Sequence, residues 1–196
     1  MQPALSQHRL MEVLVRVYLV VCLLIASPLA AAEVPVELRN WLQALDSAPT
    51  PEQIQRAGGP QVGEKLERVV RDPKEVAFVR HRAIGLLSEL DDAASLTRLN
   101  TLLTLPDDAL RATAALAWLA GPARRHPQGV MPKIAKLLAD RAAVVRAAVA
   151  RGLVYVADLP QARALAAQQR AKETHADVRA ALDLAMRKLD QMPGSR

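Results

Sequence analysis

Residues 145–156 read Val-Arg-Ala-Ala-Val-Ala-Arg-Gly-Leu-Val-Tyr-Val, and the pattern in this stretch returns three more times. An apolar residue is followed directly by Arg, and apolar or small residues stand 4, 7, 8 and 11 positions after the first. The same template starts at Val79, Leu110 and Val178. Its arginines are separated by 31, 35 and 33 positions; they are Arg80, Arg111, Arg146 and Arg179. Self-similarity at this period indicates a repeat protein.

Each copy of the template predicts an amphipathic helix. Offsets 0, 4, 7, 8 and 11 fall on one side of an α-helix, so these residues form a stripe that must be buried. A second helix is expected before each stripe. Its buried residues are expected to be Leu66, Val69 and Val70 before Arg80; Leu99, Leu102 and Leu103 before Arg111; and Ile134, Leu137 and Leu138 before Arg146. The helix expected at 162–171 is rich in Ala and Gln and therefore weaker. One pair cannot bury its stripe alone, so successive pairs are expected to stack into a continuous core.

Residues that start and stop helices agree with this pattern. Thr50-Pro51 and Asp72-Pro73 are each expected to be an N-cap followed by the first helical residue, and Gln53 would complete a capping box with Thr50. Gly121-Pro122 is expected to end one helix, and Gly58-Gly59-Pro60 to separate two others. Small residues on the stripes, Gly121, Gly152, Ala117 and Ala185, would let helices approach closely.

The composition favours helices over strands. The chain has 196 residues, of which 51% are apolar, enough for a sizeable core. Only 3% are aromatic, so residues that suit a pleated sheet are scarce. Cys22 is the only cysteine and lies in the N-terminal apolar run, which excludes a disulfide framework or a Cys-based zinc site in the rest of the chain.

The first 32 residues have the features of an export signal. A basic region with Arg9 and Arg16 precedes an apolar run at 17–26, and Ala30-Ala31-Ala32 fits a cleavage site. Cleavage is therefore expected after Ala32, giving a periplasmic or secreted protein. The alternative is a retained N-terminal membrane anchor, because 13–32 would just span a bilayer. Cleavage would remove two Arg and one Glu and leave 24 basic and 19 acidic groups, a net charge of +5.

The segment from Asp140 to Arg146, with its relatives at Arg80, Arg111 and Arg179, resembles the second helix of HEAT repeats. The resemblance covers roughly residues 60–190 and implies an α-α superhelix, a short HEAT-like solenoid of about four helix pairs whose Arg-bearing helices line the concave side. We therefore expect N-terminal capping helices at 33–58, with Leu38, Trp41, Leu42 and Leu45 at helical spacing, and a repeat domain at 59–192. An aspartate stands eight positions before Arg80, four before Arg111 and six before Arg146, so the sequence does not predict an unbroken Asp–Arg ladder.

The residues give no catalytic, cofactor or metal site. His81, His126 and His175 lack the spacing of a metal-ligand set, and Asp91-Asp92 and Asp107-Asp108 are expected to cap helices. The guanidinium groups of the four repeated arginines could bind an anion such as phosphate or carboxylate. The favoured interpretation is that these arginines connect one repeat to the next. Arg124-Arg125-His126 sits between prolines and is expected to be a solvated loop, with an anion-binding tip as the alternative.

The expected function is a non-enzymatic interaction or scaffold module of the cell envelope, which binds another protein or peptide. On the Arg-bearing helices, offsets 2, 5, 6 and 9 should lie opposite the core. The expected docking residues are Leu116, Leu119, Arg151, Val154 and Arg187.

Alternatively, a terminal segment or a second copy of the chain covers this face. The residues also leave open a HEAT-like lyase, isomerase or enzyme helper, and a binder of anionic glycan or lipid. Nucleic acid is not expected as a partner, nor membrane contact beyond the signal segment.

Overall fold

The computed structural model describes residues 34–44, 49–157 and 161–192. Helices make up most of these residues, and no strand occurs among them, so the prediction of an all-α fold is confirmed. The chain divides into two units between Val34 and Pro35, and the described helices all belong to the second unit. The predicted signal segment and Leu45 lie outside the described residues.

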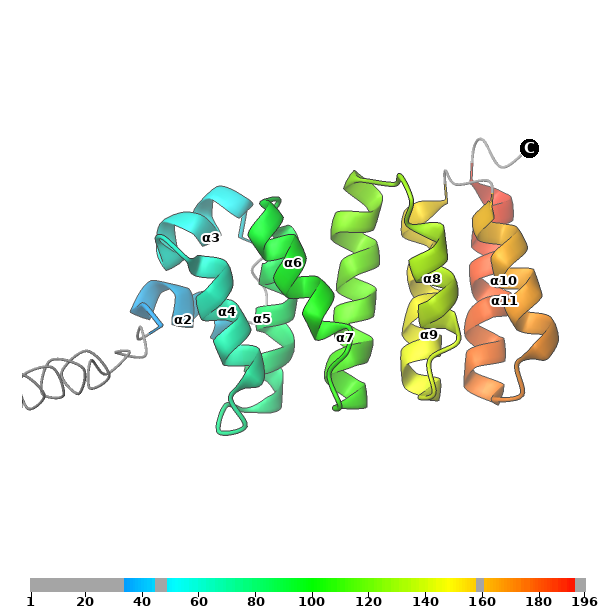
Figure 1. The fold of residues 1–196 in the computed structure, drawn as a ribbon, viewed down its shortest axis with the longest axis horizontal. Helices are drawn as coiled ribbons and strands as arrows, with labels where there is room; N and C mark the ends of the chain where they lie inside the picture. The colour runs from blue at the N-terminus through cyan, green and yellow to red at the C-terminus, as the bar shows by residue number, and fades with distance from the viewer. Residues whose placement is uncertain (1–33, 45–48, 158–160, 193–196) are drawn as a thin grey trace, which may run out of the picture. The chain divides into compact units, whose positions relative to one another are not determined.

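The elements follow one another in a regular order (Figure 1). They are α2 (Val36–Gln43), α3 (Pro51–Gly58), α4 (Val62–Arg71), α5 (Ala77–Glu89), α6 (Ala93–Leu102), α7 (Asp108–Trp118), the π-helical turn η1 (Leu119–Ala123), α8 (Met131–Leu138), α9 (Ala143–Gly152), the 3₁₀ turn η2 (Leu153–Val156), α10 (Gln161–Lys172) and α11 (Ala176–Gln191).

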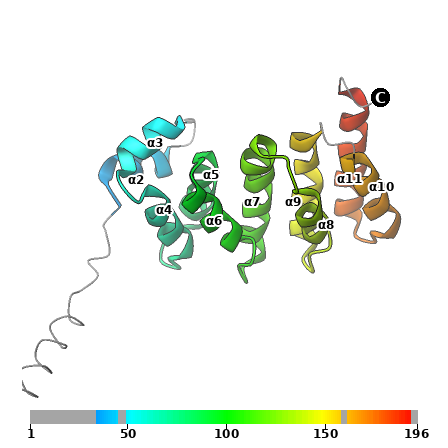
Figure 2. The same cartoon turned by 45° about the horizontal axis from the view of Figure 1, so that its top comes forward.

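From α4 onward the helices form four pairs: α4 with α5, α6 with α7, α8 with α9, and α10 with α11. The second helices of the pairs also contact one another in order, α5 with α7, α7 with α9, and α9 with α11. We call these four the second-helix row, and Figures 1 and 2 both show them side by side. Each pair thus packs mainly against its neighbours in sequence, while α2 and α3 contact the first pair through α4 and α5.

The repeated stripe forms the core of this unit. Eighteen of its twenty residues are buried, and only Ala117 and Met186 are partly exposed. The apolar residues expected on the preceding helices are buried as well, in α4, at the end of α6 and in α8. In α10 the buried residues are small or polar, namely Ala162, Ala166 and Gln169, which explains why its apolar pattern is weak.

Two of the expected helix boundaries are correct and two are wrong. Thr50 and Gln53 form the capping box of α3, and Gly58-Gly59-Pro60 separates α3 from α4. Asp72, however, ends α4; its carboxylate accepts a hydrogen bond from the Lys74 N–H at 2.8 Å, and a turn delays the start of α5 to Ala77. Gly121-Pro122 does not end α7 but lies inside η1, where the chain continues as a π-helical turn.

Two glycines allow the pairs to approach closely. A Cβ atom on Gly121 would stand 2.6 Å from the backbone oxygen of Ser88 in α5, and one on Gly152 would stand 2.6 Å from Leu119 Cδ1. Both distances are too short for real contacts. At Gly121 the obstacle is a backbone atom, so a larger residue would force the helices apart, whereas at Gly152 the buried Leu119 side chain would have to move. The second helices can therefore approach each other near the ends of α7 and α9.

Candidate functional site

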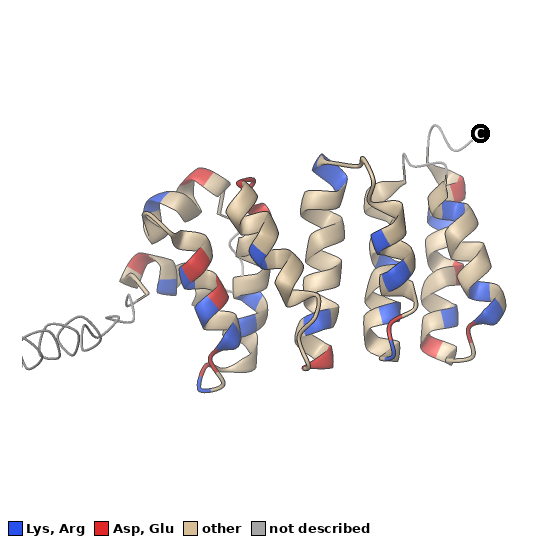
Figure 3. Ribbon diagram, in the orientation of Figure 1, with Lys and Arg blue, Asp and Glu red and all other residues tan. Residues whose placement is uncertain are grey.

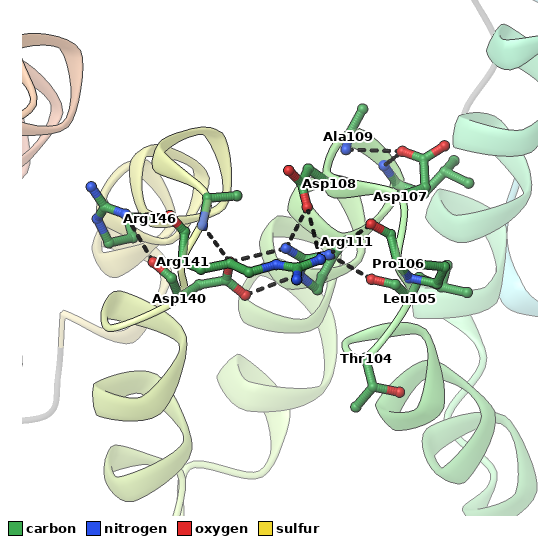
Figure 4. A network of polar contacts seen from close by, with 12 residues as sticks. Thr104, Leu105, Pro106, Asp107, Asp108, Ala109, Arg111, Asp140, Arg141 and Arg146 are labelled. Carbon is green, nitrogen blue, oxygen red and sulfur yellow. Dashed lines mark hydrogen bonds and ion pairs between the residues drawn. The ribbon is translucent and has the colours of Figure 1, made fainter.

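Arg111 in α7 connects its own helix pair to the next pair (Figure 4). Its side chain is 5% exposed and donates two parallel hydrogen bonds to Asp140, at 2.9 and 3.0 Å. It also reaches Asp108 at 2.6 Å and the backbone oxygens of Leu105 and Pro106. Burial, the largest single effect, acts to raise the pKa of Asp140. The hydrogen bonds from Arg111 and from the Ala142 N–H, together with the charges of Arg111 and Arg141, outweigh it, and the pKa of Asp140 is lowered. Arg111 is thus fully engaged within the protein and does not face a ligand.

Arg146 in α9 repeats this geometry one pair further on. It donates to Glu173 at 2.8 and 2.9 Å, and to the backbone oxygens of Asp140 and Arg141 at 2.8 and 3.1 Å. Hydrogen bonds from Arg146 lower the pKa of Glu173 to about 2. We call the Arg111–Asp140 and Arg146–Glu173 pairs the arginine ladder. Its acidic and basic segments lie together near one end of α7, α9 and α11 in Figure 3.

Sequence reasoning missed Glu173, although a signal was present. Glu173 stands six positions before Arg179, as Asp140 stands six before Arg146. Both carboxylates also accept a backbone N–H two residues later, from His175 and Ala142 at 3.0 and 2.8 Å. A pattern that allows either acid at this offset, rather than aspartate alone, predicts the second step of the ladder.

The outer two repeat arginines differ from the inner two. Arg80 donates to the backbone oxygen of Val70 at 2.8 Å, within its own helix pair. Arg179 is exposed, and in the part of the chain that the structure describes its guanidinium group forms no hydrogen bond or ion pair. The four arginines therefore do not act as one row that could grip an extended anion.

The other candidates for chemistry have structural contacts. His81 bonds Thr113 at 2.6 Å, and His126 and Arg125 both bond Asp91, at 2.9 and 3.2 Å. Asp92 and Asp107 cap α6 and α7. Within residues 34–44, 49–157 and 161–192, no group of His, Cys, Asp and Glu could hold a metal ion. No helix among those residues is long and apolar enough to cross a membrane.

A groove crosses the second-helix row. Its first part, about 520 Å³, lies over α5 and α7 and is also lined by Pro49, Thr50 and Pro51 at the start of α3. Its second part, about 310 Å³, lies over α7, the end of α9, η2 and α11. The two parts share the lining residues Leu116 and Tyr155, so they adjoin each other. The lining residues of the helices stand mostly at offsets 3, 6, 7 and 10 of the repeat: Arg82, Gly85, Leu86 and Glu89; Thr113, Leu116, Ala117 and Ala120; Arg151 and Tyr155; Ala181, Leu184, Ala185 and Lys188.

The open face is therefore rotated by about one residue from the expected offsets 2, 5, 6 and 9. Leu119 at offset 9 is 0% exposed and packs against Gly152, so the expectation that it faces a partner is wrong. Offsets 2 and 5 are also buried, at Ala112, Ala115, Ala147 and Ala150. The reason is that α7 and α9 have a neighbour on each side within the row, and these positions pack sideways against those neighbours.

Three of the five expected docking residues do come together. Leu116, Arg151 and Val154 line the second part of the groove. Arg187, at offset 9 of its repeat, does not line it, and Lys188 at offset 10 takes that place. Arg151 and Lys188 form no ion pair with an acidic residue among those that the structure describes. Their charges therefore remain at the rim of an apolar hollow that contains the half-exposed Tyr155 and Leu184.

Comparison of the chain with protein-family models, with curated proteins and with solved structures gives no match.

Proposed function

We propose that this chain is a HEAT-type interaction module of the cell envelope, which binds a helix of a partner protein in the groove. The observation that carries the proposal is the pair of adjoining hollows over successive repeats, lined largely by apolar residues and with Arg151 and Lys188 at one end. Large apolar patches rimmed by charge mark interaction sites in soluble proteins. The repeated stripe and the arginine ladder support the assignment to a HEAT-like superhelix with α2 and α3 as its cap.

The chemistry of the groove favours a helical partner segment. The walls are helices whose backbone groups are already bonded, so an extended peptide would leave many of its own N–H and C=O groups without partners. A helix satisfies those groups internally and can lay an apolar stripe into the groove. Side chains at spacings of three and four residues would then contact Leu116, Val154 and Leu184.

The charges favour an acidic flank at one end of the partner helix. Arg151 and Lys188 stand beside the second part of the groove, whereas the first part contains both Arg82 and Glu89. A carboxylate near Arg151 and Lys188 gains a charge-assisted contact without the cost of breaking an existing ion pair. The acidic end of the partner helix is therefore proposed to lie over η2 and α11.

Two exposed aliphatic side chains provide a matched test. Leu184 in the groove is 42% exposed, and Val144 at the start of α9, outside the groove, is 48% exposed. Both should tolerate Asp without unfolding. Partners are captured from an envelope extract with the full chain as bait, and the wild type is compared with Leu184→Asp and Val144→Asp. We expect Leu184→Asp to lose the partner and Val144→Asp to retain it.

Charge reversal tests the acidic flank directly. Arg151→Glu combined with Lys188→Glu should weaken the captured interaction, and replacing the partner's acidic residues by Lys should restore it. If Leu184→Asp captures the same partners as the wild type, the groove is not the binding site. If Leu184→Asp loses them but charge reversal has no effect, the groove is correct and the acidic flank is wrong.

We further propose that the chain reaches the envelope through the N-terminal segment at 1–32, with cleavage after Ala32. The compact second unit begins at Pro35, so cleavage at this point would leave that unit intact.

A further inference from the structure

A separate hollow lies on the other side of the second-helix row, between α6 and α8. It has a volume of about 270 Å³, and its lining includes Leu96 and Asn100 of α6, Trp118 of α7, Pro122 of η1, and Val130 and Lys133 at α8. None of these lining residues is acidic. The hollow shares no lining residue with the groove, so it can be tested independently of the proposed partner.

The π-helical turn η1 helps to shape this hollow. Pro122 has no N–H and cannot donate to the carbonyl of Trp118 four residues earlier, so the helix widens at this point. Widened turns of this kind are frequent at functional sites in helical proteins. Here the turn directly follows Trp118 and supplies two apolar residues of the wall, Pro122 and Ala123.

Trp118 contributes a hydrogen-bond donor, its indole N–H, for which no residue in the described part of the chain provides an acceptor. The residue is only 6% exposed, and its indole N–H forms no hydrogen bond with any residue that the structure describes. A buried donor without a partner is destabilising, and most such groups in folded proteins are satisfied by protein, water or ligand. An acceptor in the hollow would remove this cost.

Lys133 places a cation beside the same ring. Its ammonium nitrogen stands 4.7 Å from the centre of the Trp118 ring and donates to the Asn100 side-chain oxygen at 2.5 Å. An ammonium group carries three donors, so others remain for a ligand. Burial, followed by the charge of Lys136, lowers the pKa of Lys133.

We propose that this hollow binds a small carboxylate with a short apolar tail. The carboxylate accepts hydrogen bonds from the Lys133 ammonium and the Trp118 indole N–H, and the tail packs against Leu96, Pro122 and Val130. A monoanion with an apolar tail fits better than a phosphate, because the hollow offers one lysine charge and its walls include Leu96, Pro122 and Val130. A neutral carbonyl would satisfy the indole but would leave the partly buried ammonium without a counter-charge.

The proposal is tested with isobutyrate and with isobutyramide, which has the same shape but no charge. The probe signal is the indole N–H resonance in a ¹⁵N–¹H spectrum of the full chain. The sequence has two tryptophans, and a Trp41→Phe variant assigns the resonance of Trp118. We expect isobutyrate to shift the Trp118 resonance in a saturable manner and to leave that of Trp41 unchanged, and isobutyramide to shift neither.

Variants of α8 and α6 define the site. Lys133→Met should weaken isobutyrate binding by about tenfold or more, and Lys133→Arg should retain most of it. Lys136→Met is the matched control, since Lys136 is exposed on the same helix and does not line the hollow. Leu96→Trp should fill the hollow and abolish binding even if Lys133→Met does not fold.

Four outcomes would overturn the proposal. They are no saturable shift at millimolar isobutyrate, equal shifts with isobutyramide, equal shifts with inorganic phosphate, and unchanged binding by folded Lys133→Met or Leu96→Trp.

Discussion

At the scale of single residues, the arginine ladder shows how a charge can be buried between repeats. Removing a guanidinium group from water is costly, and a buried pair is tolerated only when its geometry is good and its remaining donors are satisfied. Arg111 meets both conditions, with two parallel bonds to Asp140 and others to Asp108 and to backbone oxygens. The ladder therefore sets the relative placement of pairs more than it adds net stability.

Removing one charge of the ladder should be strongly destabilising. Asp140→Asn keeps the shape and the bond to the Ala142 N–H but leaves Arg111 with less counter-charge, so we expect a loss of about 1.5–3 kcal/mol in the free energy of unfolding. Chemical denaturation followed by circular dichroism measures it. Asp190→Asn is the control, because Asp190 pairs with Arg163 in an exposed position, and its midpoint should move much less. Equal effects of the two substitutions would contradict a buried ladder.

The lowered pKa of Glu173 predicts a loss of stability in acid. The folded-state pKa is about 2, below the usual value of 4.5, so the contribution is complete above about pH 4.5 and is lost as the pH falls towards 2. Each pH unit in this window should cost up to about 1.4 kcal/mol from this group. Glu173→Gln lacks the titration and should show a shallower dependence between pH 4.5 and 2. A parallel pH profile for the wild type and the variant would refute this role.

At the scale of elements, the sequence predicts which residues of each second helix are buried, but not which face stays open. The stripe at offsets 0, 4, 7, 8 and 11 follows from helical periodicity alone. The open face depends on how far α5 and α9 cover the sides of α7, which is a tertiary property. Periodicity therefore places Leu119 on the open face, although its side chain is buried. It also places Arg187 in the groove, where the structure has Lys188 instead.

The end of α7 is equally a tertiary result. Gly and Pro in succession usually stop a helix, yet Gly121 and Pro122 lie in the π-helical turn η1 that packs against α5. A Cβ atom at Gly121 would meet the Ser88 backbone oxygen, which cannot rotate away. The glycine is needed for packing between pairs, which local sequence rules do not detect.

Two alanine substitutions separate packing from helix propensity. Gly121→Ala should destabilise the chain by about 1–3 kcal/mol, because α5 and η1 must move apart. Gly85→Ala, within α5, adds a methyl group that meets nothing within 4 Å and should stabilise by about 0.5–1 kcal/mol. Thermal unfolding of the two variants measures both effects. A stabilising Gly121→Ala would mean that the close approach of η1 to α5 is not tightly constrained.

At the scale of the whole molecule, each helix pair packs against its neighbours, and the two surfaces of the second-helix row carry different candidate sites. The sequence predicts the pairs, the shared stripe and an apolar patch with cations near Leu116 and Arg151. It does not predict the hollow at Trp118, because Leu96, Trp118 and Lys133 belong to three helices and share no motif. Sites of this kind arise from the spacing between helices and become visible only in three dimensions.

The N-terminal segment is either cleaved from the mature protein or retained as a membrane anchor. The apolar run at 17–26 is about ten residues long, short of the roughly 20 that a permanent membrane span needs, and Ala30-Ala31-Ala32 follows it. We therefore expect the protein recovered from the cell envelope to begin at Glu33, which intact mass measurement decides. Ala30→Lys combined with Ala32→Lys should block cleavage, since the site requires small residues. Recovery of a wild-type species that retains residues 1–32 would instead favour an N-terminal membrane anchor.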